Sequence, residues 1–154
     1  MKVSAYHNHL KAQEILSEKG SLIIEIEKIL NNSNLQFGTT HPSDIKEIIR
    51  EKFTHKGWVD KVKVTHSRLT INFMKNKCGT CFQLGNVART YADILKLMQL
   101  HHKKVIDVGV IIVPLKFESK SLGKNYARYE RLEEEIKLYK EIIKVPLYLM
   151  GLSN

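Results

Sequence analysis

The clearest alternation of apolar and polar residues lies at residues 69–89 and predicts a β-hairpin that leads into a helix. The apolar residues that share one face of the first strand, by its two-residue period, are Leu69, Ile71 and Phe73. A polar turn at residues 75–77 leads to a second strand, in which Cys81 and Gln83 share a face. Gly85-Asn86 ends that strand, and we expect Asn86 to cap the helix that follows. A polar set aimed at a helix N-terminus suits a phosphate or metal site, although any edge hairpin has similar features.

The same periodicities predict the helices, strands and loops of the rest of the chain. A helical period predicts helices at 6–31, 41–57, 87–100 and 126–143, and Gly20-Ser21 divides the first of these. Ser21 and Ser43 are the expected N-caps. Alternating or continuous apolar residues predict strands at 58–64, 105–113 and 145–149, whereas residues 31–34 and 116–124 are expected to be loops.

The order of these elements predicts an α/β fold. Three consecutive strands can form an antiparallel meander, and strands joined through helices are expected to be parallel neighbours. We therefore expect one mixed β-sheet flanked by helices. At 154 residues, the chain is expected to form one domain, residues 1–154.

Charge adds a candidate partner. The chain has 25 Lys and Arg against 16 Asp and Glu, a formal net charge of +9, which favours binding to polyanions such as nucleic acid. A generally lysine-rich composition is the alternative explanation. With no long apolar run and no apolar signal core, the chain is expected to be soluble and cytoplasmic, without a membrane partner.

The pair Cys78-x-x-Cys81 raises the question of zinc or redox chemistry. A zinc site needs two further ligands, of which His66 is the nearest candidate, and redox motifs of this spacing normally open a helix. Residues three apart on a strand also point to opposite faces. Two small strand residues are the simpler interpretation, and no metal site is predicted.

One block of the hairpin resembles a known family. The residues that carry the resemblance are Asn72-Phe73-Met74-Lys75 and Cys81-Phe82-Gln83-Leu84-Gly85-Asn86-Val87-Ala88-Arg89. They are similar to the BglII type of restriction endonucleases, where Asp is followed after eight residues by Glu-x-Gln, an apolar residue, Gly or Ser, and Asn. The resemblance extends from about His7 to the C-terminus and includes Lys124-x-Tyr126-x-Arg128. It implies the restriction-endonuclease-like nuclease core.

The catalytic positions of that family fall on Asn72, Cys81 and Gln83, and only Gln83 matches. In the family the two acids hold Mg²⁺, which lowers the pKa of the attacking water. Asn offers a neutral oxygen, and Cys is too soft a ligand for this cation. We therefore expect no cofactor, and Mg²⁺ only if an active site survives. A moved acid could restore activity, with candidates at Asp60, Glu14, Glu18 and Asp107; alternatively, the residues could reflect an inactivating mutation.

The family's DNA-facing positions are better preserved than its acids. They map to Gly85, Asn86, Arg89, Lys124, Tyr126 and Arg128. A helix N-terminus presents free N–H groups to phosphate, and Arg can pair with guanine through two hydrogen bonds. The alternative is that Tyr126 and Arg128 are ordinary helix-surface residues.

Three functions remain open from the sequence. The first is a protein that binds double-stranded DNA on a degenerate nuclease fold, as a homodimer or as the silent partner of an active subunit. The second is an active Mg²⁺-dependent endonuclease. The third is a structural or assembly protein that binds RNA or a larger complex, so whether the chain is an enzyme is left undecided.

Overall fold

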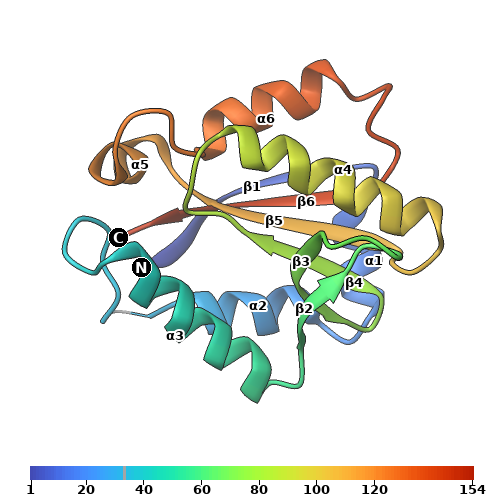
Figure 1. Ribbon diagram of the computed structural model, residues 1–154, viewed down its shortest axis with the longest axis horizontal. Helices are drawn as coiled ribbons and strands as arrows, with labels where there is room; N and C mark the ends of the chain where they lie inside the picture. Colours follow the sequence, from blue (N-terminus) through green and yellow to red (C-terminus); the bar gives the residue numbers. More distant parts are fainter. Residues whose placement is uncertain (33) are drawn as a thin grey trace.

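A six-stranded mixed β-sheet forms the centre of the protein in a computed structural model that describes residues 1–32 and 34–154 (Figure 1). The strand order across the sheet is β1-β6-β5-β4-β3-β2. The strands are β1 (Lys2–His9), β2 (Val59–Lys63), β3 (Thr70–Lys75), β4 (Cys78–Phe82), β5 (Val108–Pro114) and β6 (Leu147–Ser153). The mixed sheet predicted from the sequence is confirmed: β2, β3 and β4 form an antiparallel meander, and β4, β5 and β6 are parallel.

Helices cover both faces of the sheet. One face packs on α1 (Ala12–Glu18), α2 (Leu22–Leu30) and α3 (Pro42–His55), and the other on α4 (Ala88–His102) and α6 (Tyr129–Leu138). In Figure 1, α4 and α6 lie above the sheet and α2 and α3 below it. Each face has its own apolar cluster, and Cys78 belongs to one and Cys81 to the other, as their strand spacing predicted.

The first strand was not predicted, because residues 2–9 were assigned in part to a helix. β1 is an edge strand that pairs antiparallel with β6. Val3, Ala5 and His7 are only partly buried. A shift in the pairing register between Val3 and Ala5 puts Val3 against the apolar cluster on the α1–α3 side and Ala5 against the cluster on the α4 and α6 side. Because the register shift interrupts the two-residue period and few of the residues are apolar, the strand left little signal in the sequence.

Several boundaries and caps also differ from the predictions. Residues 116–122 form a short helix, α5 (Lys116–Leu122), rather than a loop, and α6 ends at Leu138 rather than continuing to residue 143. The side chain of Ser21 makes no capping bond. At the start of α3, His41 rather than Ser43 is the cap, since its Nδ1 accepts the Ser43 N–H. The predicted loop at 31–34 contains Ser33, which lies outside the described residues.

The buried face of α4 is rotated from the one predicted. The helical spacing of Ala88, Tyr91, Ile94, Leu95 and Met98 predicts an inward stripe. Ile94 is buried, but Leu95 is 65% exposed, and the other buried residues include Thr90, Asp93 and Leu97. Among the helices of the described residues, none combines the length and the apolar character needed to cross a bilayer.

Candidate nucleic-acid interface

The hairpin of β3 and β4 opens at Asn72. Its two-residue turn, Asn76-Lys77, has positive φ at both residues (48° and 58°), which matches the right-handed twist of the strands. Pairing runs from this turn as far as Phe73 opposite Thr80. Beyond Phe73, the Asn72 side chain replaces a backbone hydrogen bond between the two strands, because its Oδ1 accepts the Phe82 N–H at 3.0 Å.

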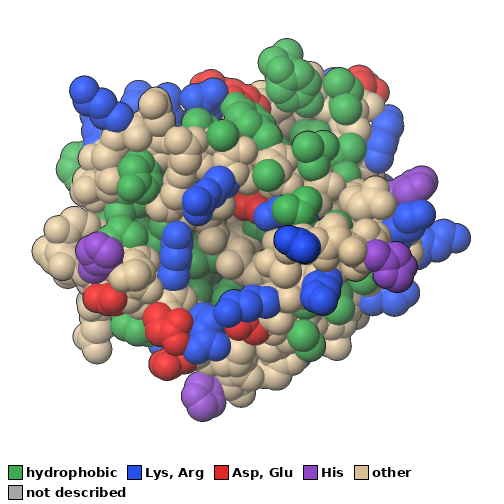
Figure 2. Space-filling model, viewed as in Figure 1, with side chains coloured by type: hydrophobic (Ala, Val, Ile, Leu, Met, Phe, Trp, Pro, Cys, Tyr) green, Lys and Arg blue, Asp and Glu red, His purple; other side chains and the backbone are tan. Residues whose placement is uncertain are grey.

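A hollow of about 660 Å³ lies where the hairpin opens, between α3 and α4. Its polar lining comes from helices on both faces of the sheet as well as from the strands. The charged and amide residues that line it are Lys46, Glu47, Arg50, Asp60, Lys61, Asn72, Gln83, Arg89, Asp93 and Lys96. Figure 2 looks onto this face of the molecule and shows Lys and Arg side chains around its central depression.

The three predicted catalytic positions are close along the hairpin but differ in their surroundings. Asn72 is exposed and Gln83 is 8% exposed, and both line the hollow. Cys81 is fully buried in the apolar cluster beneath α4 and is not part of the lining. Burial, with the nearby Asp93 carboxylate, raises the pKa of the Cys81 thiol well above its ordinary value, so the thiol stays protonated at neutral pH.

Asp93 is a buried acid of this site that the sequence analysis missed. Only 4% of the residue is exposed. Its two carboxylate oxygens have different partners: Gln83 Nε2 donates to Oδ2 at 3.1 Å, and Lys96 Nζ donates to Oδ1 at 2.9 Å. The signal was present in the sequence, since a charged residue inside the apolar stripe of a helix is unusual and indicates a paired or functional group.

Of the four acids proposed as replacements, Asp60 lines the hollow, where it lies 3.5 Å from Arg50. Asp107 lies at the start of β5, bound to Lys19 at 2.6 Å. Glu14 is on α1, where it accepts a hydrogen bond from Asn8, and Glu18 ends the same helix. None of these last three lines the hollow.

Lys61 has an unusual backbone for a strand residue. Its φ is 51°, in the left-handed region that non-glycine residues rarely adopt. The neighbouring pairs, Asp60 with Phe73 and Val62 with Ile71, put Lys61 in register with Asn72. Strained residues of this kind gather at functional sites, so the conformation supports the assignment of this hollow as a site.

The two segments predicted to face DNA lie side by side. Asn86 and Tyr126 form an isolated antiparallel bridge. The Ala127 N–H donates to the Gly85 carbonyl at 2.8 Å, and the Val87 N–H donates to the Asn125 carbonyl at 2.8 Å. Residues 85–87 and 125–127 therefore form one connected surface, although they are far apart in the sequence.

The predicted DNA-facing side chains border two hollows. Arg89 lines the first hollow, and Lys124, Tyr126 and Arg128 line a second one of about 550 Å³. Gly85 allows the backbone to pass close to the first hollow. A Cβ on residue 85 would lie 2.8 Å from Gln83 Oε1 and 3.7 Å from the Arg89 side chain. A larger residue at this position would therefore displace groups of the site.

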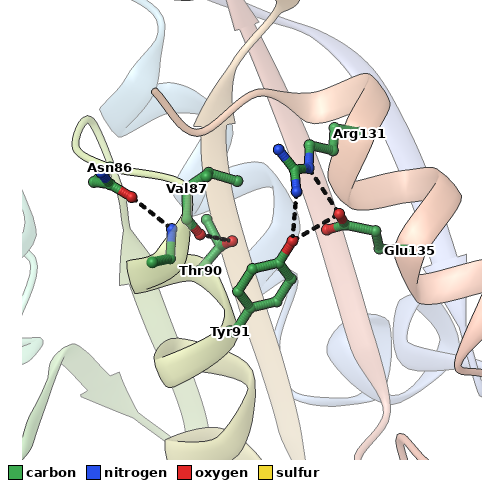
Figure 3. Close-up of polar contacts among 7 residues, drawn as sticks. Asn86, Val87, Thr90, Tyr91, Arg131 and Glu135 are labelled. Carbon is green, nitrogen blue, oxygen red and sulfur yellow. Dashed lines mark hydrogen bonds and ion pairs between the residues drawn. The ribbon is translucent and has the colours of Figure 1, made fainter. Parts of the chain in front are cut away.

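Side chains hold this surface in shape (Figure 3). Asn86 Oδ1 accepts the Ala88 N–H at 2.8 Å, so Asn86 caps α4 as the sequence predicted. Farther along, Tyr91 donates its hydroxyl proton to Glu135 at 2.7 Å and accepts a bond from Arg131 at 3.0 Å. This clamp joins α4 to α6, the helices that follow the two segments predicted to face DNA.

The two cysteines and the two histidines of β1 lie outside the lining of the first hollow. Cys78 and Cys81 are free thiols. Over residues 1–32 and 34–154, no group of three or more His, Cys, Asp or Glu side chains is arranged to hold a metal ion. His9, on β1 rather than on the predicted helix, bonds through Nε2 to the Ile143 carbonyl at 2.8 Å. His7 Nδ1 lies 3.7 Å from Glu133.

Known proteins share the fold of this protein along nearly the whole chain. The family model of restriction endonuclease BglII/BglIII matches residues 4–152. A crystal structure of restriction endonuclease BglII complexed with a DNA 16-mer matches with a TM-score of 0.81 at 18% identity, covering 100% of this chain and 77% of that one. A crystal structure of free BglII matches with a TM-score of 0.74 at 20% identity, covering 100% and 80%.

A comparison with curated proteins gave no match. The solved structures share the fold, and the predicted restriction-endonuclease-like core is confirmed. The resemblance seen in the hairpin residues extends, in the family model, over both faces of the sheet. The chain belongs to the BglII/BglIII restriction endonuclease family.

Proposed function

We propose that this protein binds double-stranded DNA on its restriction endonuclease fold and is deficient in Mg²⁺-dependent phosphodiester cleavage. The observation that carries the proposal is the state of the two positions where the family has acids. Asn72 is neutral, and its Oδ1 already accepts the Phe82 N–H. Cys81 is buried, with a thiol pKa raised well above its ordinary value. Neither side chain offers a charged oxygen to a cation.

The residues present do not fit a Mg²⁺ ion. Mg²⁺ requires oxygen ligands in near-octahedral geometry and is usually held by carboxylates. The three carboxylates of the hollow are already paired: Asp93 with Lys96, and both Asp60 and Glu47 with Arg50. A cation entering this site would have to displace these ammonium and guanidinium groups, which disfavours metal binding.

Support for DNA as the partner comes from the connected surface of residues 85–87 and 125–127. It carries basic side chains on both sides, which suit the phosphate groups of DNA. The six residues proposed to contact DNA are Gly85, Asn86, Arg89, Lys124, Tyr126 and Arg128. Salt-dependent binding to duplex DNA in preference to RNA would separate this function from an RNA-binding or assembly role.

A second candidate, an active endonuclease, is favoured by one observation. Asp93 lies beside Cys81 and is held by Gln83 at 3.1 Å, so it could supply the acid that Cys81 lacks. For this, Asp93 would have to exchange Lys96 for a metal ion. Asp60 would be the second acid, although it is paired with Arg50.

Plasmid cleavage distinguishes the two candidates. Purified protein is incubated with supercoiled mixed-sequence plasmid in Mg²⁺ and in Mn²⁺, next to the variant Asn72→Asp/Cys81→Glu. We expect no cleavage by the original chain and cleavage by the double variant. Because Cys81→Glu buries a charge, circular dichroism must first show that this variant folds. Cleavage by the original chain that Asp93→Asn abolishes would contradict the proposal and support the second candidate.

A second copy of the chain, or an active subunit in its place, is the proposed protein partner. α4 and α6 run in the same direction in Figure 1, and the Tyr91–Glu135 bond places them in contact. One turn beyond that bond, Leu95 on α4 and Leu138 on α6 are 65% and 71% exposed. Exposed apolar side chains on two adjacent helices support a two-fold interface in which each copy contributes the same helix pair.

A further inference from the structure

The first hollow contains more positive than negative groups, and its acids are all paired. Five of its lining residues are Lys or Arg and three are Asp or Glu. Arg50 lies 2.6 Å from Glu47 and 3.5 Å from Asp60, and Lys96 lies 2.9 Å from Asp93. Each carboxylate that could neutralise the hollow is therefore already used by a cation of the same hollow.

The other three cations of the hollow are Lys46, Lys61 and Arg89. Within the part of the chain that the structure describes, none of them lies within ion-pair distance of a carboxylate. Lys46 is on α3 and half-buried, whereas Arg89 is in the first turn of α4. Helices on opposite faces of the sheet thus direct positive groups at one space.

The charges of Lys46 and Arg89 are close enough to affect each other. Burial lowers the pKa of Lys46, and the positive charge of Arg89 lowers it further. Two like charges in a partly dehydrated space repel, and an anion between them would remove that cost. The charge of the pair equals that of a divalent metal ion, but it is fixed to the protein.

We propose that this hollow binds a phosphate group of duplex DNA directly through Lys46 and Arg89, without a metal ion. The inference rests on the proposed function and names the contact that replaces the family's metal. Lys96 lies in the wall of the same hollow, where its charge is balanced by Asp93. Arg89 also borders Gly85, so the phosphate would lie next to the segment proposed to face DNA.

The test is the fluorescence anisotropy of a labelled mixed-sequence duplex, measured in EDTA and then in Mg²⁺. We expect the original chain to bind equally well in EDTA. Lys46→Gln should weaken binding about three- to tenfold and lower the slope of log K against log salt by about 1, as expected for one lost phosphate contact. The matched control is Lys52→Gln, which removes the same charge from the same helix outside the hollow.

Other results of the anisotropy experiment would contradict the inference in different ways. If EDTA abolishes binding by the original chain, the metal-free contact is wrong. If Lys46→Gln and Lys52→Gln lose affinity equally while Lys124→Gln/Arg128→Gln loses much more, this inference fails and the DNA-binding function stands. If the original chain binds no duplex at all, the proposed function fails as well.

A separate arm tests free anions, because inorganic phosphate or pyrophosphate carries the same chemistry. Each is titrated into the unlabelled protein, and binding is followed by calorimetry. Tight pyrophosphate binding that depends on Lys46, in a protein with no duplex affinity, would identify a small-anion site and overturn the proposal. Duplex binding that millimolar phosphate does not displace would support it.

Discussion

At the residue scale, the two cysteines show how burial decides chemistry. Both are fully buried, and burial raises the pKa of the Cys78 thiol to about 12. Burial penalises the thiolate, so the neutral thiol dominates at all pH values at which the protein is handled. A redox pair needs an accessible thiolate, and neither cysteine provides one.

We therefore expect Cys78 and Cys81 to be unreactive in the folded protein. With Ellman's reagent at pH 8, the native chain should release almost no thiolate, and both thiols should react after addition of guanidinium chloride. The reason is that the low thiolate fraction and the lack of access both slow the attack. Rapid reaction of one thiol in the folded state would contradict the burial of that residue and reopen the redox interpretation.

At the element scale, α4 connects the candidate site to the rest of the fold. Its first turn carries Arg89, its buried face carries Asp93, and its clamp to α6 is made by Tyr91. Tyr91→Phe removes one hydroxyl that bonds to both Glu135 and Arg131. We expect a loss of about 1–2 kcal/mol in the free energy of unfolding, because hydrogen bonds to charged groups are the stronger class.

Urea denaturation at pH 7 measures this change. Tyr139→Phe is the matched control, since Tyr139 follows α6 and is 47% exposed. If both variants lose the same stability, the clamp contributes nothing specific. If Tyr91→Phe also weakens DNA binding while Tyr139→Phe does not, the clamp positions the two DNA-facing segments.

The sequence predicted the elements with strong periodicity and missed those without it. The hairpin at 69–84, the buried strand β5 and the longer helices could be predicted because apolar residues repeat along them, although the buried face of α4 could not. β1 was not predicted, because it is a partly exposed edge strand whose two-residue period is interrupted by a register shift between Val3 and Ala5. Part of the site could not be predicted either. Asn72, Gln83 and Arg89 lie on or next to the predicted hairpin, whereas Lys46 lies on a helix whose position beside the hairpin depends on tertiary packing.

At the scale of the whole molecule, the two helices on one face leave apolar side chains exposed. Leu138 at the end of α6 and Ile142 in the turn after it are 71% and 63% exposed, and Leu95 on α4 is 65% exposed. Figure 2 shows apolar side chains on the upper part of the molecule, where Figure 1 has α4 and α6. A second copy related by a two-fold axis would cover them, and it would also present two copies of the surface proposed to face DNA to one duplex.

Leu138→Glu/Ile142→Glu should therefore convert a dimer into a monomer, because a dimer interface cannot bury four unpaired carboxylates. Sedimentation equilibrium at micromolar concentration gives the mass of each form, and the monomer should also bind a duplex more weakly than the dimer. Ile24→Glu is the matched control: Ile24 is 51% exposed on α2, on the opposite face of the sheet, and should leave the mass unchanged. A monomeric original chain, or equal dissociation by both variants, would contradict this interface.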